Sequence, residues 1–325
     1  MKNDSLKFWE KGENVSLREA FGRVLVHLGK KRDDFVLFDA DIAGGTGAKP
    51  FVTAFPRRVV QFGIAEQNMM AAAGGCADTG VIPVVSTFAA FGAMRAHEQF
   101  RTAIAYPNRN VKLCCSHLGV DTGPDGATAQ MFEDLAVMRS IPGVAVVVPA
   151  DANELMRAFD AVLNRIGPVY MRIGRSPAPV ISDAKRPFVI GKATRVHEGT
   201  DATIVACGVM VARALSAADE LAAQGLHIRV VNLSTIKPLD SRELLAAARE
   251  TGAVLTAEDH NVRGGMGSAV AEFLVEHHPV PMKLVGVQDC FGKSGEATEL
   301  ANLYGLTAKH LEREVKKLIR KKYDA

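Results

Sequence analysis

The chain has 325 residues, enough for two domains with separate cores, because domains usually hold roughly 100–200 residues. Hydrophobic residues make up 48% of the sequence and charged residues 23%, and the formal net charge is +3. This balance is ordinary for a globular protein and too weakly basic to indicate binding to nucleic acid or to a membrane surface. The N-terminal stretch lacks the apolar segment of a signal peptide, and no apolar run approaches the length of a membrane-spanning helix. We therefore expect a cytoplasmic protein.

The five cysteines show no CxxC motif and no Cys/His spacing typical of a metal site. Two of them, Cys114 and Cys115, lie in the apolar run VKLCCSHLGV, which predicts a buried strand. We expect reduced thiols that behave as small hydrophobic groups, and no metal ligand set within this chain.

The first half of the chain alternates strand-like and helix-like segments. Residues 16–31 begin with Ser16 as a plausible N-cap and carry apolar residues at helical spacing, which predicts a helix. Helix-like segments also cover 91–105, 130–139 and 151–164. Short apolar runs predict strands at 57–63, 81–88, 111–117, 144–150 and 167–173, and residues 35–44 begin with a short buried strand that is followed by acids and glycines. Apolar strands separated by helices predict a parallel sheet covered on both faces.

Residues 175–190 hold three prolines and no apolar period, which indicates a linker. The alternation then resumes, with strands predicted at 201–208, 227–234, 252–259 and 281–287 and helices at 210–224, 240–250 and 264–277. We therefore predict an α/β protein with two domains, residues 1–180 and 191–325, joined by a linker at 181–190. Its last 20 residues have the charge of a nucleic-acid-binding tail, but a regular leucine stripe favours a packed terminal helix.

The stretch 62–99 carries the clearest chemical signal. Glu66 stands where a predicted strand turns into an alanine- and glycine-rich helix, and parallel sheets bind ligands at such positions. About twenty residues later, the segment STFAAF presents Phe88 and Phe91. A carboxylic acid near two aromatic rings suits a flat, protonatable heterocycle. Taken alone, the same residues also suit an acid favoured by the helix dipole and two core aromatic side chains.

Three segments together, FGIAEQ, STFAAF and SHLGVDTGPDGAT, resemble the transketolase family, which includes the synthase that makes deoxyxylulose phosphate. The second half of the chain contains VVNLSTIKPLD, TAEDHNVRGGMGSAVAEFL and DCFGKSGEATELANLYGLTAKHL, which resemble the C-terminal domain of that family. The resemblance covers nearly the whole chain. It implies a pyrimidine-binding domain for thiamine diphosphate followed by a transketolase C-terminal domain.

The resemblance assigns cofactor roles to several residues. Glu66 matches the catalytic glutamate that hydrogen-bonds a ring nitrogen of the pyrimidine and shares a proton with it, which a water-poor pocket favours. Phe88 and Phe91 match aromatic side chains that pack against the pyrimidine, and Ile64 is an apolar neighbour of the same pocket. Asp41, in FDADIAGG, matches an aspartate near the cofactor and the subunit interface, although a simple acidic turn would have the same sequence.

Four further residues match groups that handle the substrate. His117 matches a catalytic histidine that contacts phosphate, and Asp125 matches an aspartate that contacts the donor hydroxyl groups. Arg175 matches the phosphate-binding arginine, and Arg18 a second one, because an arginine fork donates paired, charge-assisted hydrogen bonds. Without the resemblance, surface salt bridges would explain both arginines equally well.

The sequence departs from the family pattern at three places. Ala129 stands where the family usually has a histidine that contacts the donor, so an ordinary sugar-phosphate donor is not assured. Met94 replaces a tyrosine that lies against the cofactor, which leaves that wall apolar. Around Gly44, Gly45 and Thr46, the serine that helps to hold phosphate has no clear match.

Full-length relatives carry an N-terminal domain with a GDG segment that binds a divalent metal and the cofactor diphosphate, and this chain has no GDG. We therefore expect a separate N-terminal subunit to supply Mg²⁺ or Ca²⁺ and the diphosphate site, in an α2β2 assembly. The expected activity is transketolase transfer of a two-carbon unit between sugar phosphates. The alternatives are a deoxyxylulose-phosphate-synthase-like enzyme, a ketoacid dehydrogenase-type subunit and a non-catalytic partner subunit.

Overall fold

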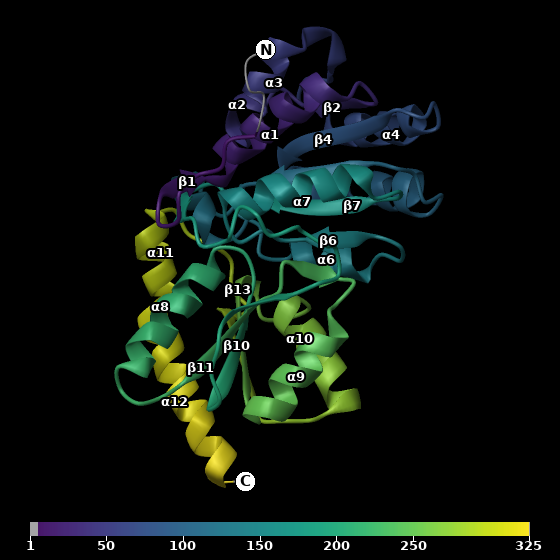
Figure 1. Ribbon diagram of the computed structural model, residues 1–325. Coiled ribbons are helices and arrows are strands. Elements are labelled where there is room, and N and C mark those ends of the chain that lie inside the picture. The colour runs from purple at the N-terminus through teal and green to yellow at the C-terminus, as the bar shows by residue number, and fades with distance from the viewer. Residues whose placement is uncertain (1–5, 325) are drawn as a thin grey trace.

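The computed structural model describes residues 6–324 and contains two principal sheets, one above the other in Figure 1. The first sheet has seven strands in the order β12-β6-β7-β5-β4-β2-β3, and all neighbouring pairs are parallel except β12 with β6. Its strands are β2 (Phe35–Asp39), β3 (Val59–Gln61), β4 (Ile82–Phe88), β5 (Lys112–Ser116), β6 (Ala145–Val147), β7 (Val169–Ile173) and β12 (Thr235–Lys237). The predicted parallel sheet is therefore confirmed.

Helices cover both faces of the first sheet because successive strand residues point to opposite sides. Leu37 packs in one apolar core with the helices α1 (Leu17–Lys31), α3 (Lys49–Ala54) and α7 (Ala152–Asn164). Phe38 packs in another core on the opposite face. That face is covered by α4 (Glu66–Ala77), η2 (Ala90–Arg95), α5 (His97–Gln99), η3 (Phe100–Ala105) and α6 (Asp134–Ser140). The segment predicted as one helix at 91–105 is thus two π-helical pieces around a short α-helix.

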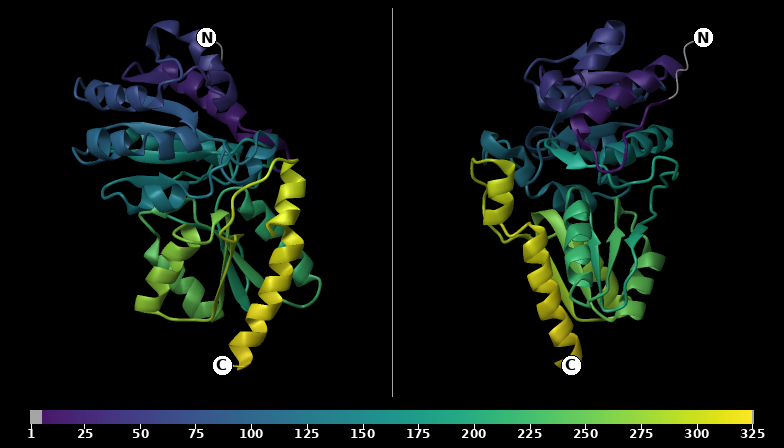
Figure 2. Two further views of the ribbon diagram at one scale, coloured as in Figure 1. Left: turned by 180° about the vertical axis from the view of Figure 1, so that it is seen from behind. Right: turned by 60° about the vertical axis from the view of Figure 1, so that its left-hand side comes forward.

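The second sheet has five strands in the order β14-β13-β10-β11-β9. Only the β9–β11 pair is antiparallel. The strands are β9 (Thr194–His197), β10 (Ala202–Ala206), β11 (Ile228–Asn232), β13 (Val254–Asn261) and β14 (Met282–Val287). Helices α8 (Met210–Ala222) and α12 (Ala308–Asp324) cover one face, and α9 (Ser241–Thr251) and α10 (Met266–His277) cover the other, as Figure 2 shows. The predicted terminal helix packs through Leu311, Val315 and Leu318, all buried.

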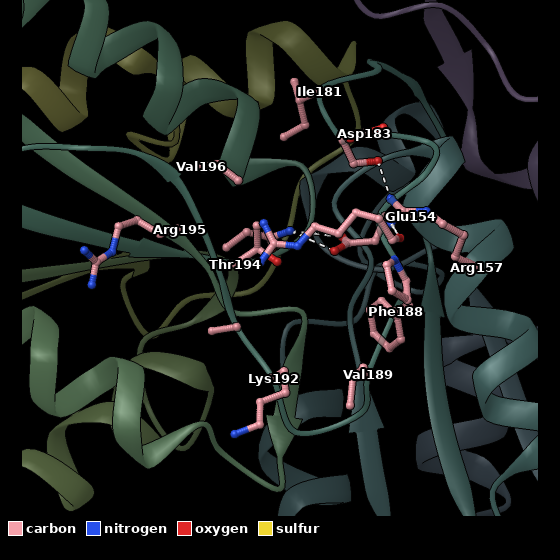
Figure 3. Close-up of a pocket in the computed structure, with 15 residues that line it drawn as sticks. Glu154, Arg157, Ile181, Asp183, Phe188, Val189, Lys192, Thr194, Arg195 and Val196 are labelled. Atoms are coloured by element: carbon pink, nitrogen blue, oxygen red, sulfur yellow. Dashed lines mark hydrogen bonds between the residues drawn. The ribbon is translucent and has the colours of Figure 1, made fainter.

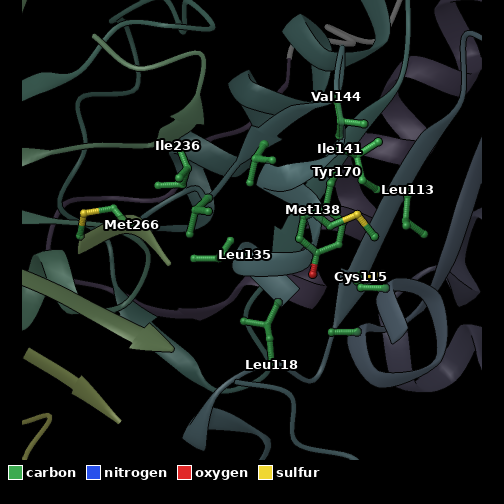
Figure 4. Packing of buried hydrophobic residues seen from close by; sticks show 14 of the residues in the cluster. Leu113, Cys115, Leu118, Leu135, Met138, Ile141, Val144, Tyr170, Ile236 and Met266 are labelled. Carbon is green, nitrogen blue, oxygen red and sulfur yellow. The ribbon is translucent and has the colours of Figure 1, made fainter. Parts of the chain in front are cut away.

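The two halves are joined more closely than a flexible linker would join them. Part of the predicted linker at 175–190 forms β8 (Pro177–Pro179), which pairs with β1 (Asn14–Ser16). β12 follows β11 of the second sheet in sequence but adds to the edge of the first sheet. One apolar cluster also spans both halves, with Leu135 and Met138 of α6 near Ile236 and Met266 (Figure 4). The remaining elements are α2 (Ala43–Thr46), η1 (Pro56–Arg58), η4 (Val120–Asp125) and α11 (Ala297–Leu303).

A buried ion pair reinforces this junction. Arg172 donates to Asp134 through Nε at 2.7 Å and through a second nitrogen, and both side chains are almost fully buried. Tyr170 donates its hydroxyl to the same carboxylate at 2.5 Å. Arg172 also donates to the backbone oxygen of Asp259 in the second domain, at 3.0 Å. Because these polar groups are buried away from water, each of them would destabilise the fold if its partner were removed.

Within residues 6–324, no helix combines the length and the apolar character needed to cross a membrane.

Candidate functional site

The sequence-predicted site residues gather at the carboxyl-end edge of the first sheet. Phe88 ends β4, and its register partner Ser116 ends β5 immediately before His117. Ser116 pairs in turn with Ile173 at the end of β7, two residues before Arg175. Because parallel strands end at the same edge, residues far apart in sequence meet here. The edge of the sheet therefore positions the site.

Glu66 is the first residue of α4 and only 4% of it is exposed. Its carboxylate accepts a hydrogen bond at 3.0 Å from Nη1 of Arg95, whose side chain is about half exposed. The two apolar residues predicted beside the cofactor are open to solvent in this chain: Ile64 is 77% exposed and Met94 is 48% exposed. The side chain of Glu66 is thus buried in this chain, while Ile64 and Met94 remain exposed.

Four flat groups form a continuous stacked row. The rings of His117 and Phe88 lie nearly parallel with their centroids 3.5 Å apart. Phe88 and Phe91 are also nearly parallel, at 5.5 Å, and the guanidinium carbon of Arg95 lies 4.5 Å from the centre of the Phe91 ring. Gly45 stands against this row, since a Cβ there would lie only 2.9 Å from Cε1 of Phe88. Within the stretch Gly44, Gly45 and Thr46, where the family's serine has no clear match, a side chain at Gly45 would therefore press on Phe88.

The two predicted phosphate-binding arginines are held by a single hydroxyl group. Ser16 caps α1 by accepting from the backbone N–H of Arg18 at 3.3 Å, and its hydroxyl donates to the backbone oxygen of Arg175 at 3.1 Å. The carboxylate of Asp121 accepts the N–H groups of Arg175 and Ser176 at 2.9 and 2.8 Å. Among the described residues, the buried Nε atoms of Arg18 and Arg175 have no hydrogen-bond acceptor.

His117 stands at one end of the stacked row, near Arg18 and Arg175. Its Nδ1 is 2.9 Å from the Ser116 hydroxyl, and its Nε2 is 3.4 Å from the carboxylate of Asp125. Burial, together with the positive charges of Arg18 and Arg175, lowers the pKa of His117 from 6.5 to about 3. The imidazole is therefore neutral near pH 7, and it can offer an N–H donor but no positive charge of its own.

Two predicted positions lie at the margin of this arrangement. Asp41 is exposed with a left-handed φ of 60°, and its N–H donates to Oε1 of Gln61 at 2.8 Å. Ala129 is half-buried after the η4 turn, and its N–H donates to the oxygen of Gly126. Neither residue touches the stacked row through a contact that the structure shows among residues 6–324.

A cavity of about 470 Å³ lies elsewhere, between α7 and the segment 181–196 that leads into the second domain. Figure 3 shows Lys192 and Arg195 directed away from Glu154. Nε of Arg195 donates a hydrogen bond to Oε1 of Glu243 at 2.9 Å. No residue predicted for the site lines this cavity. In the same described residues, no cluster of three or more His, Cys, Asp or Glu side chains could hold a metal ion.

Sequence reasoning missed several residues that build the site. Ser16 was predicted only as a helix cap, and Asp121 lay unassigned inside the SHLGVDTGPDGAT segment. Arg95 carried no signal at all, because its contact with Glu66 joins positions 29 residues apart and depends on how η2 packs against α4. Only the contact between His117 and the Ser116 hydroxyl could be expected directly from the sequence, because the two residues are adjacent.

The chain thus combines two mostly parallel α/β sheets with a buried glutamate, a stack of aromatic rings and two arginines at one edge of the first sheet. Residues 13–180 match the family model "Transketolase, pyrimidine binding domain", and residues 191–311 match "Transketolase, C-terminal domain". The chain belongs to the transketolase family.

The relatives include subunits and sections of divided transketolases. The chain is 42% identical to the 6-deoxy-6-sulfo-D-fructose transketolase subunit SqwH of Clostridium sp. strain MSTE9, over 97% of this chain and 98% of the relative. It is 39% identical to a putative transketolase C-terminal section of Methanocaldococcus jannaschii, over 94% of this chain and 98% of the relative. A solved structure described as a split gene transketolase, inactive beta4 tetramer, superposes with a TM-score of 0.88 at 45% identity, covering 94% of this chain and 99% of that one.

Proposed function

We propose that this chain is the C-terminal subunit of a divided transketolase, which moves a two-carbon ketol unit from a ketose donor to an aldose acceptor. The observation that carries the proposal is the buried carboxylate of Glu66 beside the row of parallel rings. The proposed domains are residues 1–180 and 191–325, with 181–190 between them. The chain aligns over 97% and 94% of its length with relatives named as a transketolase subunit and a transketolase C-terminal section, which supports a divided enzyme.

The residues at this edge fit the pyrimidine end of thiamine diphosphate. A nearly buried carboxyl group can hold or accept a proton at a ring nitrogen, and Phe91, which is stacked on Phe88, offers a flat apolar face to the ring. When bound, the cofactor supplies the carbon nucleophile and the electron sink for breaking and forming the C–C bond. Glu66 holds the shared proton, and Ile64 and Met94 cover the ring once a partner subunit closes over them.

The basic pair fits the anionic end of a sugar. Arg18 and Arg175 each present a buried Nε without an acceptor, and His117 adds a neutral donor. This set binds a phosphate or a sulfonate through charge-assisted hydrogen bonds. The carboxylate of Asp125 lies 4.0 Å from Nε of Arg175 and 3.4 Å from Nε2 of His117, and we assign it to the substrate hydroxyl groups next to the anion. Because Ala129 carries only a methyl group, a donor other than a common ketose phosphate, such as a deoxysulfo sugar, also fits.

The diphosphate end of the cofactor requires oxygen ligands and a divalent ion. We propose that an N-terminal subunit supplies them as Mg²⁺ or Ca²⁺, in an α2β2 assembly, and that Asp41 lies at the interface with that subunit. The solved relative described as an inactive beta4 tetramer supports the view that such a chain needs a partner to act.

Reconstitution tests the proposal. The chain is purified alone and together with the product of a neighbouring gene that encodes a GDG-containing N-terminal subunit, each with thiamine diphosphate and Mg²⁺. Two-carbon transfer between a ketose phosphate and an aldose phosphate is expected only for the pair. Glu66→Gln should lower kcat of the pair by about 10²–10⁴-fold, whereas Glu98→Gln, at an exposed acid on α5, should not. Turnover by the single chain, or consumption of pyruvate without ketose transfer, would contradict the proposal.

A further inference from the structure

We propose that Arg95 competes with the aminopyrimidine ring of the cofactor for the carboxylate of Glu66, and that its side chain leaves when the ring binds. The inference rests on the proposed function, because it takes Glu66 as the pyrimidine ligand. It goes further by giving a role to a residue that neither the motifs nor the basic pair include.

The contacts of Arg95 are those that a pyrimidine ring would make. Its Nη1 donates to Oε2 of Glu66 at 3.0 Å, and its guanidinium carbon lies 4.5 Å from the centre of the Phe91 ring. A guanidinium is planar, donates N–H bonds to carboxylates and stacks on aromatic faces. A protonated aminopyrimidine has the same three properties. Since only 4% of Glu66 is exposed, its carboxylate offers little space for both groups on the side of Phe91.

The side chain of Arg95 is half exposed, whereas its backbone is tied to α4 by a hydrogen bond. The Arg95 backbone oxygen accepts a hydrogen bond from Nε2 of Gln67 at 3.2 Å, and the residue ends η2. About half of the side chain is exposed, and Glu66 is its one ion-pair partner among the described residues. An ion pair and a cation–π contact at such an exposure are weak enough for a ligand to replace. The contact therefore gives the buried carboxylate of Glu66 a charged partner before the cofactor binds. It is also weak enough for the cofactor to displace.

The test uses the complete chain and the pyrimidine fragment of the cofactor, 4-amino-5-hydroxymethyl-2-methylpyrimidine, which needs no diphosphate site. Its affinity is measured by ligand-observed NMR for the wild type, Arg95→Ala and Arg101→Ala. Arg101 is an exposed arginine in η3 and serves as the matched control. Arg95→Ala should bind the fragment about three- to twentyfold more tightly, and Arg101→Ala should match the wild type. Raising the salt concentration should narrow the difference, because salt screens the competing ion pair.

Equal or weaker binding by Arg95→Ala would overturn the competition, since a guanidinium that helps to hold the ring would give that result. The double variant Arg95→Ala with Glu66→Ala separates this failure from failure of the proposed function. If it loses the tight binding, the fragment lies at Glu66 and the competition is supported. If it binds like Arg95→Ala, Glu66 is not the ligand and both proposals fail. Circular dichroism and thermal unfolding confirm that each variant is folded.

Discussion

Gly45 offers a sharp test of whether the stacked row is built as the structure shows. A Cβ added at Gly45 would lie 2.9 and 3.0 Å from Cε1 and Cζ of Phe88 and 3.3 Å from Cγ1 of Ile42. Carbon atoms pack best at about 3.5–4.0 Å, so the ring must shift by roughly half an ångström or more. That shift is opposed because Phe88 is stacked on His117 at 3.5 Å and lies beside Phe91.

Gly44 is the matched control for this substitution. It lies in the same short helix, α2, and a Cβ there would meet nothing within 4 Å. Gly44→Ala should therefore stabilise the protein by about 0.4–1 kcal/mol, because it restricts the unfolded chain. Gly45→Ala restricts the unfolded chain in the same way, but overpacking against Phe88 should lower the stability of the folded state by about 1–3 kcal/mol. We expect Gly45→Ala to unfold with a free energy about 1–3 kcal/mol lower than that of Gly44→Ala.

Urea unfolding of both variants measures this difference, and the affinity for the pyrimidine fragment reports on the rings. Gly45→Ala should weaken fragment binding because Phe88 and Phe91 can no longer keep their spacing, whereas Gly44→Ala should leave it unchanged. If the two variants had the same stability and the same fragment affinity, the placement of Phe88 against Gly45 would be wrong.

Two further predictions concern the junction and the pH dependence. Arg172→Ala should lower the free energy of unfolding by about 3–5 kcal/mol, because it leaves Asp134 buried without its charged partner. The control Arg139→Ala breaks the more exposed pair with Glu272 and should lower it by only about 0–1 kcal/mol. Equal losses of stability in the two variants would contradict the buried network. The pKa of His117 is lowered to about 3, so the unfolded chain binds more protons between pH 3 and 6.5, and stability contributed by neutral His117 is lost as pH falls through that window. Between pH 7 and pH 5, the free energy of unfolding of the wild type should fall by about 1–2 kcal/mol more than that of His117→Asn. An NMR titration of the His117 ring with a midpoint near 6.5 would refute the lowered pKa.

Local sequence patterns were sufficient to predict the parallel sheets and the edge at which the site forms. Apolar runs such as residues 81–88 become buried strands, and Glu66 begins a helix, because both outcomes depend on neighbouring residues. Parallel strands then bring their carboxyl ends together, so that Phe88, His117 and Arg175 meet without further information. The pairing of distant segments was less accessible. Pro177 and Pro179 predicted a linker, yet they form β8 in a two-stranded pair, where prolines without an N–H are tolerated.

The protonation of His117 shows why residue identity alone could not define the site. A histidine near phosphate suggests a cation, but the structure packs its ring on Phe88 and places it near two arginines, which keep it neutral. In the proposed anion site, the positive charge therefore comes from Arg18 and Arg175 and not from His117. Such a division of roles depends on burial and on the sum of neighbouring charges, and neither is contained in a short motif.

The stacked row links the two ends of the proposed site physically. Phe88 contacts His117 on the substrate side and Phe91 on the cofactor side, and Phe91 is followed by the Arg95 guanidinium on Glu66. A group that displaces Arg95 therefore acts on the same stack that sets the position of His117. Because packed rings have little room to move independently, we expect changes at Gly45 to affect both fragment binding and anion binding. A chain in which the aromatic residues only filled a core would show the loss of stability without either binding effect.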